Sequence, residues 1–143
     1  MTVKLLFCFL LILGFSSFEK EHNAYDLTVK ATGIKSKNGQ IEFALYKDNN
    51  VFAKEGKTYK LIRKSIADDE VSCTFKDLPE GKYAVCIYHD ANNNHLCDKN
   101  FFGIPTEAYG FSNNRKPILS IPTFDDCSVQ LNANKSISIK LIY

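Results

Sequence analysis

Apolar and polar residues alternate along several short stretches of this chain, with turn residues between the stretches. A period of two residues is typical of a β-strand that turns one face to a core. The alternation predicts strands at residues 27–32, 41–46, 71–75, 83–88, 129–131 and 137–143. Residues 59–66 alternate less clearly because lysines and Arg63 interrupt the pattern, which indicates an edge strand, with a short helix as the alternative.

Two turn motifs predict how neighbouring strands are connected. Asn38-Gly39 lies between the first two strands, and Asn-Gly readily takes the positive φ angles of a tight turn, so we expect residues 27–46 to form a hairpin. The run Leu78-Pro-Glu-Gly-Lys-Tyr83 is similar to the tyrosine corner of immunoglobulin-like sandwiches. This motif predicts that the strands before and after it lie in opposite sheets.

The segment from His89 to about Pro122 has no sustained periodicity. Loops of this length are uncommon in compact domains and are usually functional or disordered, and the aromatic residues of this one argue against disorder. The whole pattern predicts an all-β fold. We expect an immunoglobulin-like or transthyretin-like β-sandwich of about seven strands with one long irregular loop segment.

The first residues have a different character from the rest. Lys4 precedes an apolar run, residues 5–15, of about eleven residues, which is shorter than the roughly twenty that a membrane span needs. Small residues at Gly14 and Ser16 then favour cleavage by a signal peptidase. We therefore predict a signal peptide at 1–16, a flexible leader at 17–26 and a single domain at 27–143. The mature protein is expected to be exported to a periplasmic, extracellular or cell-surface location, without a membrane span.

Charge and cysteine content refine this picture. The chain has 18 basic and 16 acidic residues, and removal of residues 1–16 takes away one basic residue, Lys4, to leave 17. No basic stripe stands out, so no nucleic-acid partner is expected. Four cysteines remain in the mature chain, and an even number in an exported domain predicts disulfides, with three possible pairings. They are Cys73, Cys86, Cys97 and Cys127.

The candidate chemistry is concentrated in the loop that follows the strand at 83–88. Oxygen-bearing side chains occupy positions 1, 3, 5 and 9 of an EF-hand-like spacing, position 7 offers its carbonyl, and a later glutamate supplies a further carboxylate if the chain folds back. Calcium requires six to eight oxygen ligands, which such a loop can direct to one point. The predicted calcium ligands are Asp90, Asn92, Asn94, Leu96, Asp98 and Glu107.

Two other interpretations of this loop stay open. In the first, the Asn and Asp side chains bind their own backbone in Asx turns and no metal is present. In the second, zinc takes nitrogen, sulfur and oxygen ligands from the same stretch, although the spacing matches no zinc signature. The zinc candidates are His89, His95, Cys97 and Asp98.

An enzyme and a binding surface are further alternatives. A small exported hydrolase or metal-dependent enzyme would use His89 as base with Asp90 or Glu107 as its partner, but no serine lies in a nucleophile-elbow motif. A binding or accessory module for an unknown protein, peptide or carbohydrate would use an aromatic platform, unless the same rings pack the long loop onto the sheets. The four rings are Phe101, Phe102, Tyr109 and Phe111.

Several of these motifs resemble one known family. They are Phe75-Lys-Asp-Leu-Pro-Glu-Gly-Lys-Tyr-Ala-Val85, His89-Asp-Ala-Asn-Asn-Asn94, Asp98, Gly103-Ile-Pro-Thr-Glu107 and Tyr109-Gly-Phe-Ser-Asn-Asn114. Together they resemble the exported bacterial proteins of domain of unknown function 2141, over about residues 27–143. The resemblance implies export and a sandwich-like fold, and it assigns no activity. The family pattern usually has a glycine where this chain has His95.

Overall fold

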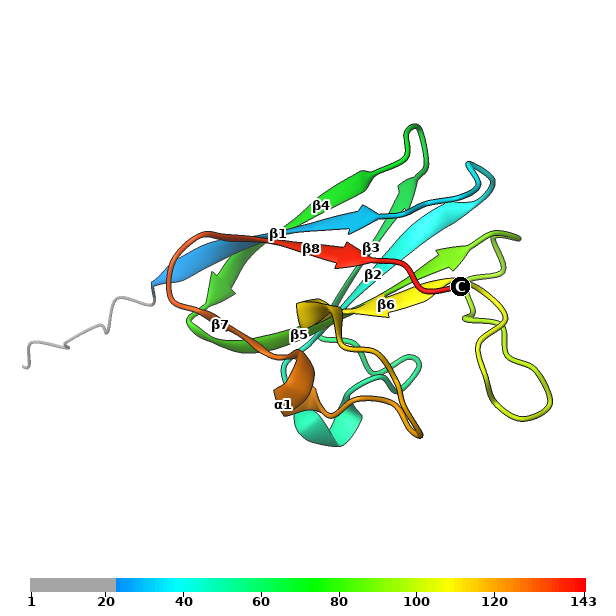
Figure 1. Ribbon diagram of the computed structural model, residues 1–143. Helices are drawn as coiled ribbons and strands as arrows, with labels where there is room; N and C mark the ends of the chain where they lie inside the picture. Colours follow the sequence, from blue (N-terminus) through cyan, green and yellow to red (C-terminus); the bar gives the residue numbers. More distant parts are fainter. Residues whose placement is uncertain (1–22) are drawn as a thin grey trace, which may run out of the picture.

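Eight strands form two sheets in this computed structural model, which describes residues 23–143 (Figure 1). The predicted signal peptide, and the leader as far as residue 22, lie outside the described residues. The strands are β1 (Ala24–Thr32), β2 (Gln40–Tyr46), β3 (Lys60–Ser65), β4 (Val71–Pro79), β5 (Gly81–Asp90), β6 (Tyr109–Phe111), β7 (Val129–Leu131) and β8 (Lys135–Lys140). The short helices are η1 (Asn49–Val51), η2 (Ser112–Asn114) and α1 (Phe124–Cys127).

One sheet has the strand order β4-β1-β8 and the other the order β3-β2-β5-β6, with β7 beside the first residues of β5. Only the β1–β8 pair is parallel, and Figure 1 shows these two strands side by side with their arrowheads pointing the same way. The predicted all-β class is therefore confirmed, with two sheets and eight strands in the described residues. Within residues 23–143, no helix has the length and apolar character needed to cross a bilayer.

The main core lies between the two sheets. Leu27 and Val29 of β1 pack in one cluster with Phe43 of β2 and with Val85 and Ile87 of β5, and all five are buried. They come from alternate positions of their strands, as the period of two predicts. Burial of a side chain of this size contributes about 1.5–3 kcal/mol. The two-sheet arrangement therefore rests on the residues that the alternation identified.

The predicted hairpin of residues 27–46 is wrong. Both of its strands exist, but β1 pairs with β4 and β8, whereas β2 pairs with β3 and β5. The turn residues instead carry the chain from one sheet to the other. Gly39 has the expected positive φ of 78°, and a Cβ added there would lie 2.0 Å from the carbonyl oxygen of Asp90. An alternating strand and a flexible turn do not specify the partner strand, which explains the error.

The predicted corner is confirmed. β4 and β5 are consecutive in the chain but belong to different sheets. The hydroxyl of Tyr83 donates a hydrogen bond to the carbonyl of Pro79 at 2.8 Å, which fixes the change of direction between the two strands. Tyr83 is fully buried at this point.

Two further elements show where the sequence pattern was sufficient and where it was not. Residues 60–65 do form a strand, β3, which pairs on one side only, so the edge-strand prediction is confirmed. The long aperiodic segment contains a strand, β6, that was not predicted. It has three residues, which is too short for an alternation to be visible. β6 pairs with β5 and thereby ties the middle of the long segment to the sheet.

Candidate functional site

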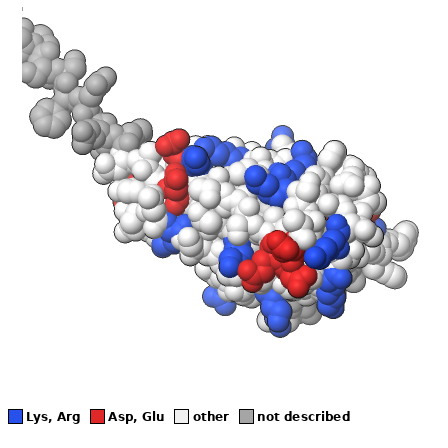
Figure 2. Space-filling view, turned by 90° about the horizontal axis from the view of Figure 1, so that it is seen from above, with Lys and Arg blue, Asp and Glu red and all other residues white. Residues whose placement is uncertain are grey.

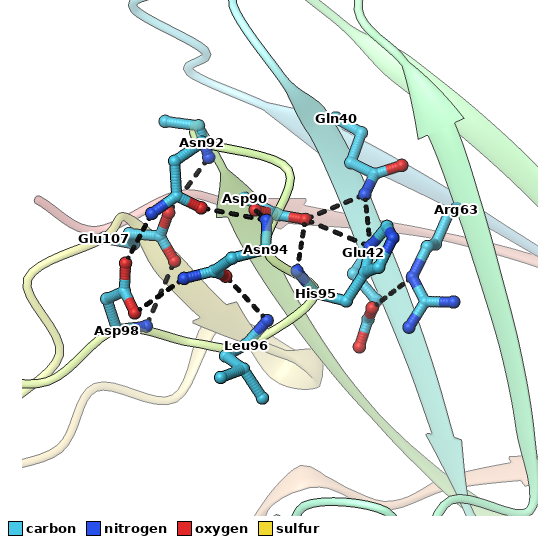
Figure 3. A network of polar contacts seen from close by, with 11 residues as sticks. Gln40, Glu42, Arg63, Asp90, Asn92, Asn94, His95, Leu96, Asp98 and Glu107 are labelled. Carbon is cyan, nitrogen blue, oxygen red and sulfur yellow. Dashed lines mark hydrogen bonds and ion pairs between the residues drawn. The ribbon is translucent and has the colours of Figure 1, made fainter.

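Asp90 is the last residue of β5 and lies at the base of the candidate loop, residues 90–107. Its side chain is fully buried. Its Oδ1 accepts a hydrogen bond from the N–H of Asn94 at 3.0 Å, and its Oδ2 accepts from Gln40 Nε2 at 2.8 Å and from the N–H of His95 at 3.1 Å (Figure 3). Gln40 is the register partner of Asp90 in β2, so the sheet itself brings the amide to the carboxylate.

These hydrogen bonds determine the charge of Asp90. Burial raises the pKa of its carboxyl group, but the hydrogen bonds from Gln40, His95 and Asn94, together with the charge of His95, lower it by more. The net result is a pKa below the usual value for aspartate. Asp90 is therefore a buried anion that the beginning of the loop wraps around.

Asn92 and Asn94 repeat one local pattern along the loop. The side-chain oxygen of Asn92 accepts from the N–H of Asn94 at 3.0 Å, and that of Asn94 accepts from the N–H of Leu96 at 2.9 Å. These are Asx turns. The amide nitrogens of both residues donate to the carboxylate of Asp98, at 2.7 Å from Asn92 and 3.0 Å from Asn94 (Figure 3). Three of the predicted ligands thus meet at one point.

Glu107 folds back onto the loop, as the sequence suggested it would if it were a ligand. Its Oε1 accepts from the N–H of Ala91 at 3.0 Å, and its Oε2 accepts from the N–H of Asp98 at 3.1 Å. The N–H of Thr106 also donates to the carbonyl of Asp98 at 2.8 Å. One carboxylate therefore holds both ends of the stretch 91–98. We call this pair of hydrogen bonds the Glu107 clamp.

Leu96 differs from the other five predicted ligands. Its side chain is exposed and points away from the polar network in Figure 3. Because its side chain carries no polar atom, its carbonyl is the only group that it could offer to a cation, and its N–H donates to the side chain of Asn94. The structure therefore brings together Asp90, Asn92, Asn94, Asp98 and Glu107, and it leaves Leu96 at the margin.

The stretch 91–98 bends through two residues with left-handed backbone angles. Asn93 has a φ of 59° and His95 a φ of 66°. Asparagine and histidine enter this region more often than most residues other than glycine, but in both the Cβ crowds the backbone and makes the conformation costly. His95 is the position at which the resemblance described from the sequence implies a glycine. It takes the glycine conformation here, and its Nδ1 lies 2.9 Å from Gln40 Nε2 and 3.5 Å from Asp90 Oδ2.

The residues of the zinc and hydrolase alternatives are not arranged for those roles. His89 and Asp90 are consecutive in β5, so their side chains point to opposite faces of the sheet. His89 is buried, and its Nε2 contacts the carbonyl oxygen of Asn38 at 2.6 Å. No group of three or more His, Cys, Asp or Glu side chains within residues 23–143 is placed to hold a metal. This geometry supports neither alternative.

The predicted disulfides are not found. Cys73, Cys86, Cys97 and Cys127 are free thiols in the described part of the chain. Burial raises the pKa of Cys73 to about 12 and the pKa values of Cys97 and Cys127 to about 11, and it raises that of Cys86 well above the ordinary value. Cys73 and Cys127 are buried and Cys86 and Cys97 half-buried, and protonated thiols in such surroundings are poor nucleophiles and poor metal ligands.

A groove of about 550 Å³ lies over the outer face of the five-stranded sheet, and sequence reasoning missed it. Its floor includes Ala44 and Tyr46 of β2, Cys86 of β5 and Tyr109 of β6. Its walls are formed by the segments 53–58, 97–105 and 117–121. The second of these belongs to the candidate loop, and the third follows η2. The run Phe43-Ala-Leu-Tyr46 was the available signal, because a strand that is apolar at consecutive positions has both faces covered.

The four predicted platform rings do not act together. Phe101 and Phe102 are 97% and 82% exposed, whereas Phe111 is buried in a second cluster that also contains Phe52 and Phe124. Tyr109 is half-buried at the edge of that cluster. Two rings therefore pack the long segment onto the sheet, as the alternative interpretation proposed, and two face solvent.

Comparison with known proteins identifies the family. Residues 29–140 match the model of the family described as "Uncharacterized protein conserved in bacteria (DUF2141)". The match covers most of the chain and nearly all of the two sheets, so the chain belongs to this family, as its motifs suggested. Neither a curated protein nor a solved structure matches it.

Proposed function

We propose that this protein is an exported β-sandwich module, of the immunoglobulin-like or transthyretin-like kind, that acts in binding or as an accessory protein. In this proposal the ligand lies in the groove and calcium stabilises the loop at 90–107. The observation that carries the proposal is the Glu107 clamp, because the same segment that it fixes continues directly into a wall of the groove. Support for the sandwich type comes from the tyrosine corner at Tyr83.

The lining of the groove favours an apolar ligand. Side chains such as Ile104, Ile121 and Tyr109 line it. Its charged members are few: Glu42 of β2 on the floor, and Glu55 and Lys99 in the walls. A volume of about 550 Å³ is within the range of about 300–1,000 Å³ typical of ligand sites. We therefore propose an apolar segment of a peptide or protein as the ligand, in preference to a carbohydrate, which needs more polar partners.

Calcium is proposed from the set of oxygen atoms in the loop, although the carboxylates of Asp90, Asp98 and Glu107 do not converge on one point in this structure. Three carboxylates and two amides from the predicted set lie within one hydrogen-bonded network (Figure 3). At present the amide nitrogens of Asn92 and Asn94 face Asp98. A cation bound beside the carboxylate of Asp98 would require both amides to turn their oxygens toward it. The two Asx turns would then be lost. The proposal thus predicts a local rearrangement of the loop on calcium binding.

Thermal unfolding in calcium and in a chelator tests this part of the proposal. We expect a higher melting temperature with calcium, and we expect Asp90→Ala to remove the difference because it deletes the first ligand. Asp68→Ala, at an exposed carboxylate outside the loop, is the matched control and should keep the difference. Equal melting temperatures for the wild-type protein with calcium and with chelator would contradict the proposal that calcium stabilises the loop.

Binding of the apolar fluorescent probe 1-anilinonaphthalene-8-sulfonate to the folded protein tests the groove. Ile104→Glu places a charge in the wall and should weaken probe binding about tenfold or more. Leu61→Glu changes an exposed apolar residue of β3 outside the groove and should leave binding unchanged. Equal effects of the two substitutions, or no probe binding, would contradict the groove as a ligand site.

A further inference from the structure

Two loop segments carry most of the large hydrophobic side chains that this protein exposes. The segments are residues 101–104 and 118–121, and we call them the apolar tips. Six of the ten large exposed hydrophobic residues within 23–143 belong to them. These six are Phe101, Phe102, Ile104, Ile118, Leu119 and Ile121. A concentration of this kind on a folded protein marks an interaction surface.

The apolar tips lie close together in space although η2 and β6 separate them in the chain. Phe102 and Ile104 from one tip line the same groove as Ile118 and Ile121 from the other. Figure 1 shows both loops extending from the same side of the five-stranded sheet, below β6 in that view. The two tips therefore form one surface at the mouth of the groove.

A ligand inside the groove would cover this surface only in part, because five of the six tip residues line the groove but several remain largely exposed. Phe101 is 97% exposed and is not among the residues that line the groove, although its ring packs edge-to-face on that of Phe102 at 5.6 Å. Leu119 is 100% exposed and Ile118 is 91% exposed, so their side chains project outward from the mouth. Only a partner that lies across the tips from outside would bury them.

The charges beside the tips identify the kind of partner. Lys99 lies two positions before the first tip, and Arg115 and Lys116 precede the second. Arg115 also lies 4.0 Å from the carboxylate of Asp126, so Lys99 and Lys116 are the basic residues on which the argument depends. Residues 99–104 and 115–121 contain no acidic residue. By contrast, Figure 2 shows both Lys or Arg and Asp or Glu on the face of the molecule seen from the side of β1, β4 and β8. Each tip thus combines projecting apolar side chains with basic residues at its base.

We infer that the apolar tips dock onto the surface of an anionic lipid bilayer. The apolar side chains enter the boundary between headgroups and acyl chains, and the basic residues contact the headgroups. Aromatic and aliphatic side chains that project from two adjacent loops can insert into the fluid boundary region of a bilayer. The core of a protein–protein interface is, by contrast, a closely packed patch. The groove then opens toward the membrane.

Vesicle co-sedimentation tests this inference directly. The chain is used from residue 17 and also at full length, because the apolar run at 5–15 would bind lipid by itself. We expect binding to vesicles of phosphatidylglycerol and phosphatidylcholine, and weaker binding to phosphatidylcholine alone. Phe101→Ser with Leu119→Ser should reduce the partition coefficient about tenfold or more. Lys99→Glu with Lys116→Glu should abolish the preference for anionic vesicles.

Control variants distinguish vesicle binding through the apolar tips from nonspecific hydrophobic adsorption and from binding in the groove. Leu61→Ser removes an exposed apolar side chain from β3, and Lys76→Glu reverses an exposed charge on β4. Both should bind vesicles like the wild-type protein, and all variants should keep their melting temperature. The inference would be overturned if the chain from residue 17 did not bind vesicles. It would also be overturned if the variant with Phe101→Ser and Leu119→Ser bound them as well as the wild-type protein does. Tip-dependent dimers in analytical ultracentrifugation without lipid binding would overturn it too. Probe binding in the groove is measured separately, so the two proposals can fail independently.

Discussion

The carboxylate of Glu107 accepts a hydrogen bond from the N–H of Asp98 at 3.1 Å, across nine positions of the chain. Its second oxygen accepts from Ala91 at the other end of the same loop. This contact converts a long aperiodic segment into a closed loop with defined ends. The first apolar tip and most of the wall segment 97–105 lie between Asp98 and Glu107, in the part of the chain that this contact closes.

The first prediction concerns the strength of the Glu107 clamp. Glu107→Gln keeps one acceptor oxygen but presents an amide nitrogen to the other N–H. We expect the free energy of unfolding to fall by about 1–3 kcal/mol, the usual cost of leaving a partly buried donor without its acceptor. Urea unfolding at neutral pH measures this change. Glu80→Gln, at an exposed residue, is the control and should change stability by less than about 0.5 kcal/mol. A similar small change in Glu107→Gln would show that the clamp is not important for stability.

The second prediction is a pH dependence that comes from Asp90. Its pKa is lower in the folded protein than in the unfolded chain, so the stability that it contributes is present above the unfolded value, near 4, and is lost as the pH falls through the folded value. Unfolding free energies measured from pH 7 down to pH 3 should therefore decrease toward acid. The slope in the acid range should be smaller in Asp90→Asn. Asp126 has a lowered pKa as well, so the difference between wild-type and variant is the relevant quantity.

Asp68→Asn removes the same charge from an exposed position and should keep the wild-type slope. Equal slopes in all three proteins would mean that Asp90 does not have the lowered pKa that its hydrogen bonds imply.

The third prediction distinguishes free thiols from disulfides. The chain from residue 17 contains four cysteines, and all four are free in the structure. Titration with Ellman's reagent in denaturant, without a reducing agent, should give four thiols. In the folded protein the reaction should be at least about tenfold slower, because burial keeps the thiols protonated. A result of zero or two thiols in denaturant would restore the disulfides that the even cysteine count suggested.

The sequence was most informative where side chains alternate or bind locally. The alternation identified the strands of the core, and the run from Leu78 to Tyr83 correctly placed β4 and β5 in different sheets. The spacing from Asp90 to Asp98, with Glu107, identified the residues that do meet in one network. Each of these inferences depends on residues near one another in the chain, or on one carboxylate with few possible partners.

What the sequence did not reveal depends on contacts between distant segments. The partner strands of β1 and β2 are determined by packing between sheets, so the Asn38-Gly39 turn was wrongly interpreted as a hairpin. The groove is built from β2, β5, β6 and three loops, and no local pattern describes such a surface. The left-handed conformation of His95 was also hidden, because a residue with a Cβ takes these backbone angles much less often than glycine does.

The most direct test of the account is the response of Asn94→Asp to calcium. In the structure the amide of Asn94 donates to Asp98, so an aspartate there would place two carboxylates together and should lower the melting temperature in a chelator. The same substitution adds a charged oxygen ligand, so calcium should raise the melting temperature by more than it does in the wild-type protein. Asn100→Asp is the matched control, because Asn100 uses its side-chain oxygen to accept from Phe102 and Ile104 and lies outside the predicted ligand set. Calcium-dependent stabilisation that is larger in Asn94→Asp than in wild-type or Asn100→Asp is the predicted result. A loss of stability in Asn94→Asp that calcium does not restore would contradict the account and leave the loop as a metal-free network of Asx turns.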